Sequence, residues 1–216
     1  MAHEEQLQFF LDVKKYFPIF FDNKKVLDVG SVDINGSAKS YFSNCDYLGI
    51  DVAPGKGVDL VCKGEEYDGP DNYFDTVVSG EVMEHNPHWV ETMRNMIRVC
   101  KPGGLVIMTC AGLGRGEHGT TRTADDPLLS VQIGWDYYRN LKESDFRKSG
   151  AVEGLECVFI PNYYKYDLYM VGIKSPASQM DISKLKSIKY DYRKFSYASW
   201  KAIRRAIRLN LLNVRN

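Results

Sequence analysis

The sequence predicts an α/β protein with a doubly wound, mostly parallel, seven-stranded sheet. Short apolar runs alternate with helical patterns, and most runs are continuously apolar, as in strands buried on both faces. The last two runs are joined by a turn-like segment at 161–167, which predicts an antiparallel closing strand. The seven runs cover residues 24–30, 47–52, 58–62, 73–79, 105–110, 155–160 and 168–173.

Helical patterns occupy the intervals between these runs. Apolar residues at helical spacing between 7 and 17 predict an opening helix, which ends before Pro18 because the residue before proline disfavours helical torsions. Residues 37–42 begin a second helical segment. A third spans 90–100, and the stretch Lys101-Pro-Gly-Gly stops it.

Composition narrows the class of protein. With 216 residues, 44% hydrophobic and 26% charged, the chain is one globular domain with room for a small appendage, which excludes a disordered or fibrous protein. No stretch approaches the roughly 20 apolar residues of a membrane span, and the acidic start MAHEEQLQFF has no secretory pattern. Five widely spaced cysteines without a CxxC pair favour a reduced, cytoplasmic protein.

Charge is distributed unevenly along the chain. Residues 1–180 carry 18 Lys and Arg against 26 Asp and Glu, a balance of −8, whereas residues 181–216 carry 10 basic residues against two acidic ones, a balance of +8. An acidic body with a basic tail is typical of a catalytic domain with an interaction element. We therefore predict a domain over 1–180 and a basic amphipathic tail over 181–216.

The tail contains one strongly amphipathic stretch, residues 195–211, with apolar residues on one side of a helix and four basic residues on the other. Such a helix packs on the protein body or on another copy of the chain, lies on an anionic membrane surface, or binds nucleic acid. We favour packing or an oligomer contact, with peripheral membrane association next. Nucleic acid is the least favoured partner, because basic residues are confined to the tail.

The residues after the first two strands are placed to bind a ligand, since open α/β sheets bind ligands beyond the carboxyl ends of their strands. Gly30 and Gly36 follow the first strand, but they do not form the GxGxxG of a dinucleotide cradle. Asp51 ends the second strand about 20 residues later, the spacing at which an acidic residue accepts hydrogen bonds from ribose hydroxyls. The spacing therefore favours a site for a nucleoside-containing cofactor over a strand-to-helix turn that binds no ligand.

An ordered set of four segments carries a family resemblance: VLDVG (26–30), GID (49–51), FDTVVSGEVMEH (74–85) and CKPGGLVIMT (100–109). With them, residues 24–175 resemble the class I S-adenosylmethionine-dependent methyltransferases, in particular the type 11 branch. The resemblance implies a Rossmann-like methyltransferase fold, S-adenosyl-L-methionine as cofactor and transferase activity.

The resemblance also implies which residues hold the cofactor. Asp28 and Gly30 correspond to positions under the methionine moiety, Asp51 to the ribose contact and Val52 to the adenine packing position. The loop before Gly36 is longer than the family usually has, so Ser31 and Asn35 are expected to supply polar groups that other members take from backbone. The remaining implied contacts are Gly64 and Glu65 at the adenine edge, and Ser79, Gly80 and Glu81 near the methyl sulfonium.

The long loop 111–127 follows the fifth strand, over the expected mouth of the site, and it contains His118. Histidine suits a general base near neutral pH, so His118 is the candidate catalytic residue; the alternative is a loop histidine paired with a neighbour such as Glu117. His85 is expected to be structural. We predict no metal site, because the four histidines show no ligand pairing with cysteine, and Pro87 disrupts the spacing of His85 and His88.

The leading functional hypothesis is methyl transfer to a small polar acceptor, in particular a hydroxyl of a sugar or surface-glycan precursor. The mixed charges of loop 111–127 and the aromatic residues after it, Trp135, Tyr137 and Tyr138, suit such a ligand, although solvated charges and core aromatics explain the same pattern. Two alternatives stay open: an RNA or protein methyltransferase that docks its substrate through the tail, and a cofactor-binding module without transferase activity.

Overall fold

The computed structural model describes residues 4–123 and 129–194 and contains one seven-stranded sheet, in the order β3-β2-β1-β4-β5-β7-β6. The first five strands pair in parallel, and β7 pairs antiparallel with both β5 and β6. The predicted α/β class, with its antiparallel closing strand, is therefore confirmed. The strands are β1 (Lys25–Val29), β2 (Asp46–Asp51), β3 (Leu60–Val61), β4 (Phe74–Gly80), β5 (Cys100–Ala111), β6 (Leu155–Asn162) and β7 (Asp167–Lys174).

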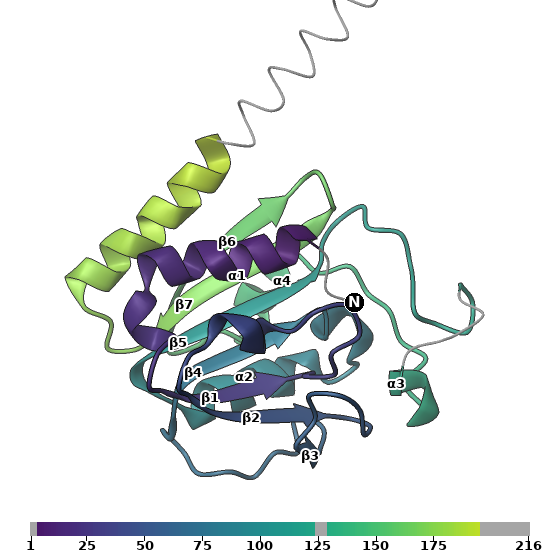
Figure 1. The fold of residues 1–216 in the computed structure, drawn as a ribbon. Coiled ribbons are helices and arrows are strands. Elements are labelled where there is room, and N and C mark those ends of the chain that lie inside the picture. Colours follow the sequence, from purple (N-terminus) through teal and green to yellow (C-terminus); the bar gives the residue numbers. More distant parts are fainter. Residues whose placement is uncertain (1–3, 124–128, 195–216) are drawn as a thin grey trace, which may run out of the picture.

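Helices cover both faces of the sheet (Figure 1). Successive strand residues point to opposite faces, so Val77 packs in one core and Val78 in the other. The first core is covered by α2 (Trp89–Val99) and α4 (Glu143–Lys148). The second is covered by α1 (Glu4–Tyr16), the short helices η1 (Pro18–Phe20) and η2 (Ala38–Tyr41), and a helix over residues 179–194. The remaining short helices are η3 (Met83–His85) and α3 (Leu129–Gln132).

Three elements differ in extent from the sequence expectation. Strand β5 begins at Cys100, five residues early, because Cys100 pairs with Phe74 before a register shift restores regular pairing at Leu105. Strand β3 has only two residues, Leu60 and Val61; both are exposed, and β2 is their single neighbour. The segment 37–42 forms only the 3-10 helix η2, in which the Ser37 side chain accepts a hydrogen bond from the Lys39 N–H, 3.1 Å away.

The helix over 179–194 packs beside α1 and crosses the predicted domain boundary at residue 180 (Figure 1). Its Leu185 and Ile188 are buried in the core that holds Phe9 of α1, and the Tyr192 hydroxyl donates to Asp12, 2.9 Å away. The first part of the predicted tail thus contributes to the core of the body. The amphipathic stretch 195–211 lies outside the described residues. Among the described residues, no helix is long and apolar enough to cross a membrane.

Candidate functional site

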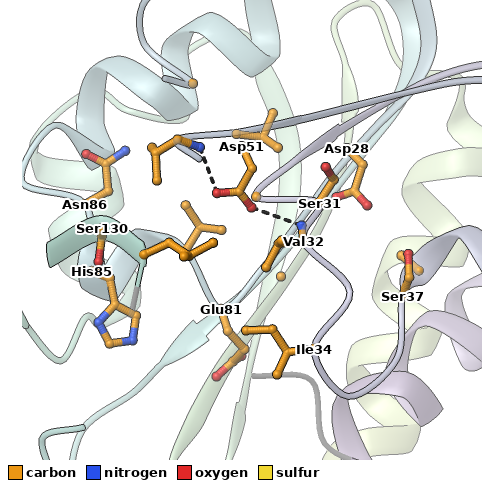
Figure 2. A pocket seen from close by; sticks show the side chains of 18 of the residues that line it. Asp28, Ser31, Val32, Ile34, Ser37, Asp51, Glu81, His85, Asn86 and Ser130 are labelled. Atoms are coloured by element: carbon orange, nitrogen blue, oxygen red, sulfur yellow. Dashed lines mark hydrogen bonds between the residues drawn. The ribbon is translucent and has the colours of Figure 1, made fainter. Parts of the chain in front are cut away.

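A pocket opens at the carboxyl ends of β1, β2 and β4, beneath the start of α1. In the sheet, β1 lies between β2 and β4, so the chain leaves β1 toward one side and later returns on the other. This is the point at which open α/β sheets bind ligands. Figure 2 shows side chains from all three strand ends converging on the pocket.

Gly30 lines the pocket, and its backbone conformation and close surroundings favour glycine at that position. Its φ is +83°, in the left-handed region that side chains disfavour. A Cβ there would lie 2.0 Å from Val82 Cγ2, on the loop after β4. The chain after β1 therefore packs directly against the side chain of Val82, on the loop after β4, and both residues line the pocket.

Asp51, at the end of β2, is fixed by the backbone around it. Its Oδ2 accepts from the Val32 N–H at 3.0 Å and its Oδ1 from the Val52 N–H at 2.7 Å, as the dashed lines in Figure 2 show. Burial raises the pKa of Asp51, and these N–H groups act in the opposite direction. The carboxylate is thus held at the pocket wall, where it can still accept a hydrogen bond from a ligand hydroxyl.

Asp28, near the end of β1, is a buried acid beside Gly30. The Tyr47 hydroxyl donates to its Oδ2 at 2.7 Å. Burial raises the pKa of Asp28 to about 7, and the bond from Tyr47 lowers it only in part. Such a carboxyl ionises when a cation, such as the ammonium group of an amino acid, lies next to it.

Most of the residues predicted to bind the cofactor line this pocket; these are Asp28, Gly30, Ser31, Asp51, Val52, Gly64, Gly80 and Glu81. Three others do not line it. Asn35 is exposed on the loop after β1, and Ser79 is buried within β4. Glu65 accepts a hydrogen bond from the Thr92 hydroxyl at 3.0 Å, which ties the loop after β3 to α2.

Sequence reasoning missed the wall that α1 contributes. Gln6, Leu7 and Phe10 line the pocket, and the Gln6 side-chain amide donates to the Thr109 hydroxyl of β5 at 2.7 Å. The available signal was a glutamine on the otherwise apolar face of the opening helix. Asn86, Ser130 and Trp135 also line the pocket, and of these only Trp135 was a sequence candidate.

A second group of side chains lies where the loops after β4 and β5 meet. His85 lines the pocket; its ring centroid is 4.9 Å from that of His118 and 5.4 Å from that of Tyr138. Burial lowers the pKa of His85 to about 3, so its ring is neutral. His118 does not itself line the pocket, and it reaches the site through His85. Together with Glu84, the two histidines bring their ligand atoms within 4.8 Å of one another, which is close enough to hold a metal ion.

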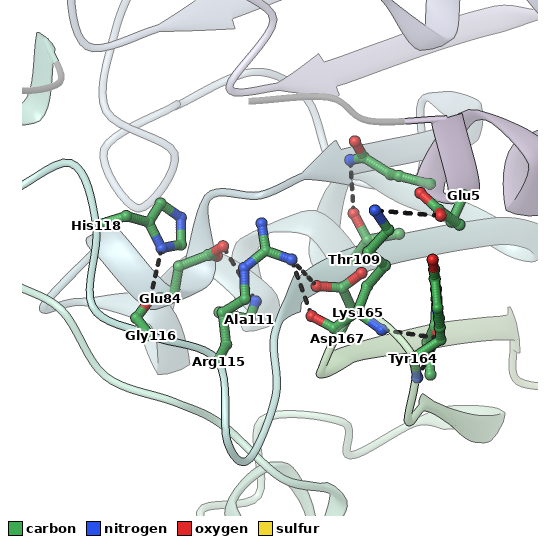
Figure 3. Close-up of polar contacts among 12 residues, drawn as sticks. Glu5, Glu84, Thr109, Ala111, Arg115, Gly116, His118, Tyr164, Lys165 and Asp167 are labelled. Carbon is green, nitrogen blue, oxygen red and sulfur yellow. Dashed lines mark hydrogen bonds and ion pairs between the residues drawn. The ribbon is translucent and has the colours of Figure 1, made fainter. Parts of the chain in front are cut away.

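The loop after β5 is anchored to neighbouring segments by its charged residues. Arg115 donates to Asp167 at 2.7 Å and to the Lys165 carbonyl at 3.0 Å, which joins the loop to the β6–β7 turn (Figure 3). Arg122 pairs with Glu117 and Asp136. These arginines therefore stabilise the loop, and Glu117 is a partner of Arg122 rather than of His118.

The chain is similar to a known protein family and to several solved structures. A family model described as a methyltransferase domain matches residues 1–117, just over half of the chain. The YcgJ protein of Bacillus subtilis superposes with a TM-score of 0.55 at 13% identity, over 80% of this chain and 99% of that one. No curated protein matches the sequence.

Two further solved structures hold ligands. The 1,6-didemethyltoxoflavin-N1-methyltransferase of Burkholderia thailandensis, with its substrate and S-adenosylhomocysteine bound, has a TM-score of 0.51 at 15% identity, over 81% of this chain and 91% of that one. The phosphoethanolamine N-methyltransferase 2 of Haemonchus contortus, with phosphomonomethylethanolamine and S-adenosylhomocysteine, has a TM-score of 0.54 at 16% identity, over 79% and 52%.

The chain belongs to the methyltransferase domain family, and its sheet is that of the class I methyltransferases. The family and the fold that the sequence resemblance implied are thereby confirmed.

Proposed function

We propose that the protein transfers a methyl group from S-adenosyl-L-methionine to a hydroxyl of a small polar acceptor. The observation that carries the proposal is the convergence of Asp28, Gly30 and Asp51 on one pocket at the switch point of a methyltransferase sheet. The sulfonium of the cofactor supplies an activated methyl group, so the protein's task is to hold the nucleophile in line and to keep water out.

The charges and contacts of the pocket suit the parts of this cofactor. Asp28 faces the ammonium group, the main chain at Gly30 accommodates the methionine moiety, and Asp51 accepts from both ribose hydroxyls. Val52 and Gly64 line the pocket at the place where the adenine is expected. A Cβ at Gly64 would lie 2.7 Å from Thr92 Cγ2 and 2.8 Å from Val29 Cγ1, so the chain packs tightly at that edge.

The acceptor approaches from the side of Glu81, His85 and Tyr138, next to Gly80 where the methyl sulfonium is expected. His118 faces the same side through its contact with His85. Its Nδ1 lies 3.0 Å from the Gly116 carbonyl, so an N–H there leaves Nε2 without a proton. Burial lowers the pKa of His118, which keeps the ring neutral. A neutral imidazole at this position assists the loss of a hydroxyl proton, and the aromatic ring of Tyr138 favours a sugar.

The other functional readings have less support. An RNA or protein substrate docked by residues 195–211, and a membrane or oligomer contact by the same stretch, depend on residues outside the described part of the chain. A module without activity has no specific observation in its favour. The five cysteines, all free, support our proposal of a cytoplasmic location.

A transfer assay tests the proposal. The protein is incubated with methyl-labelled cofactor and three acceptor sets: sugars and sugar nucleotides, an RNA mixture, and a peptide mixture. We expect label in a sugar hydroxyl with release of S-adenosylhomocysteine, and loss of transfer in Asp51→Ala. Label only in RNA or peptide, with none in any hydroxyl compound, overturns the acceptor class.

A further inference from the structure

Glu84, His85 and His118 form a cluster of side chains that can bind a metal ion. The three residues come from two loops, since Glu84 and His85 lie in η3 after β4, and His118 lies in the loop after β5. Their ligand atoms lie within 4.8 Å of one another. Sequence spacing predicted no metal site here, because it compared histidines that are near one another in the chain.

Two of these side chains are buried and make few hydrogen bonds to the described residues. Glu84 is fully buried and His85 is 4% exposed. Glu84 Oε1 accepts from the Ala111 N–H at 3.0 Å. Its Oε2 and the ring nitrogens of His85 form no hydrogen bond of regular geometry, and the Glu81 carboxyl and the Tyr137 backbone interact with them more weakly. Buried polar groups are normally well paired, so a carboxylate and an imidazole that are poorly paired and lie side by side favour a ligand at this place.

The third residue is oriented by its surroundings. The contact between His118 Nδ1 and the Gly116 carbonyl fixes the tautomer that leaves Nε2 able to coordinate, as outer hydrogen bonds do in metal sites (Figure 3). The Ala111 N–H orients the Glu84 carboxylate in the same manner, and both bonds are drawn in Figure 3. A hydrogen bond between the carboxyl groups of Glu81 and Glu84 joins Glu81 to the edge of the cluster.

We propose that Glu84, His85 and His118 bind a divalent first-row transition metal ion that coordinates the acceptor hydroxyl. Two imidazoles and one carboxylate suit Zn²⁺, Co²⁺ or Mn²⁺. They suit Mg²⁺ and Ca²⁺ less well, because those ions prefer sites made only of oxygen ligands. Three protein ligands leave at least one coordination position open, as in catalytic sites. His85 also lines the cofactor pocket, so the ion lies beside the place where the methyl group is transferred.

The inference rests on the proposed function and specifies how the acceptor is activated. A coordinated hydroxyl has a lowered pKa and loses its proton to water. The oxygen then uses an electron pair to form the new C–O bond, the C–S bond breaks toward sulfur, and the sulfonium becomes the neutral thioether of S-adenosylhomocysteine. The ion is unchanged, and His118 acts as its ligand instead of as the base itself.

Metal titration of the full chain tests the site. The protein is treated with chelator, dialysed and titrated with Co²⁺, followed by its visible absorption, with Zn²⁺ as competitor. We expect one ion per chain, bound at least about tenfold more weakly by His118→Asn and by Glu84→Gln. Glu84→Gln keeps an oxygen that accepts from the Ala111 N–H. His118 is partly exposed, so His118→Asn is expected to fold. The matched control is His88→Asn, an exposed histidine three residues from His85.

The metal site is overturned if His118→Asn binds Co²⁺ as tightly as the unchanged protein. It is also overturned if His88→Asn weakens Co²⁺ binding as much as His118→Asn does. A parallel titration of the chelated protein with S-adenosylhomocysteine separates this outcome from failure of the proposed function. Cofactor binding without metal binding overturns only the ion and returns His118 to the role of direct base. Metal binding without cofactor binding keeps the site and overturns the methyltransferase proposal.

Discussion

Cofactor affinity should depend on pH through Asp28. This carboxyl is buried beside the pocket, and its pKa is raised to about 7. Only the ionised form pairs with the ammonium group of the cofactor, so each protonated molecule must lose a proton before it binds. Affinity therefore increases as the pH rises through 7 and decreases as it falls.

The magnitude follows from the pKa. With a value near 7, Asp28 is about nine-tenths protonated at pH 6 and about one-tenth protonated at pH 8, so the Kd should be about tenfold weaker at pH 6. The same shift affects folding. Between an unfolded pKa of 3.8 and the folded value of about 7, the folded state binds more protons, so stability decreases as the pH rises across that window, by at most about 4 kcal/mol.

Calorimetric titration with S-adenosylhomocysteine at pH 6, 7 and 8 measures this dependence. Asp28→Asn should bind weakly with a flat pH profile, and at pH 8 it should be more stable to urea than the unchanged protein. Tyr47→Phe removes the bond that lowers the pKa of Asp28, so it should move the midpoint of the profile to higher pH. A Kd that does not change with pH, or that is tighter at pH 6, refutes the role of Asp28.

Three other substitutions test separate parts of the structure. Asp51→Asn places an amide donor against a backbone N–H. It should weaken the binding of S-adenosylhomocysteine about 100-fold, roughly 3 kcal/mol, as measured by calorimetry. An unchanged Kd would show that Asp51 does not contact the ligand. Gly30→Ala should lower the free energy of unfolding by about 2–4 kcal/mol in urea, and adding Val82→Ala should recover only the steric part; no recovery contradicts the 2.0 Å contact. Ile188→Ala should cost about 3 kcal/mol in the same assay, whereas Met180→Ala, at a position that is 66% exposed, should be neutral; equal effects would separate the helix 179–194 from the core.

Most of the strands could be predicted from the sequence, because strands that are buried on both faces are apolar throughout. The runs around Val26 and Val106 are examples. Where the environment is less uniform, the pattern fails: Leu60 and Val61 look like strand interior but lie exposed at the edge of the sheet. The early start of β5 at Cys100 depends on pairing with Phe74, which local sequence does not encode.

The positions of Asp28, Gly30 and Asp51 around the pocket were predictable, and those of His85 and His118 were not. Asp28, Gly30 and Asp51 lie at strand ends, where the topology fixes their position. The contact between His85 and His118 depends on how two loops fold over the sheet, and the wall from α1 depends on where the opening helix docks. Such long-range packing leaves no periodic signal along the chain.

Binding of S-adenosylmethionine in this pocket is tested most directly by a calorimetric titration of the full chain at pH 8 with S-adenosylhomocysteine and, separately, with NAD. We predict micromolar binding of S-adenosylhomocysteine, lost in Asp51→Ala, and no measurable binding of NAD. Preference for NAD, or no binding of S-adenosylhomocysteine, would contradict this prediction.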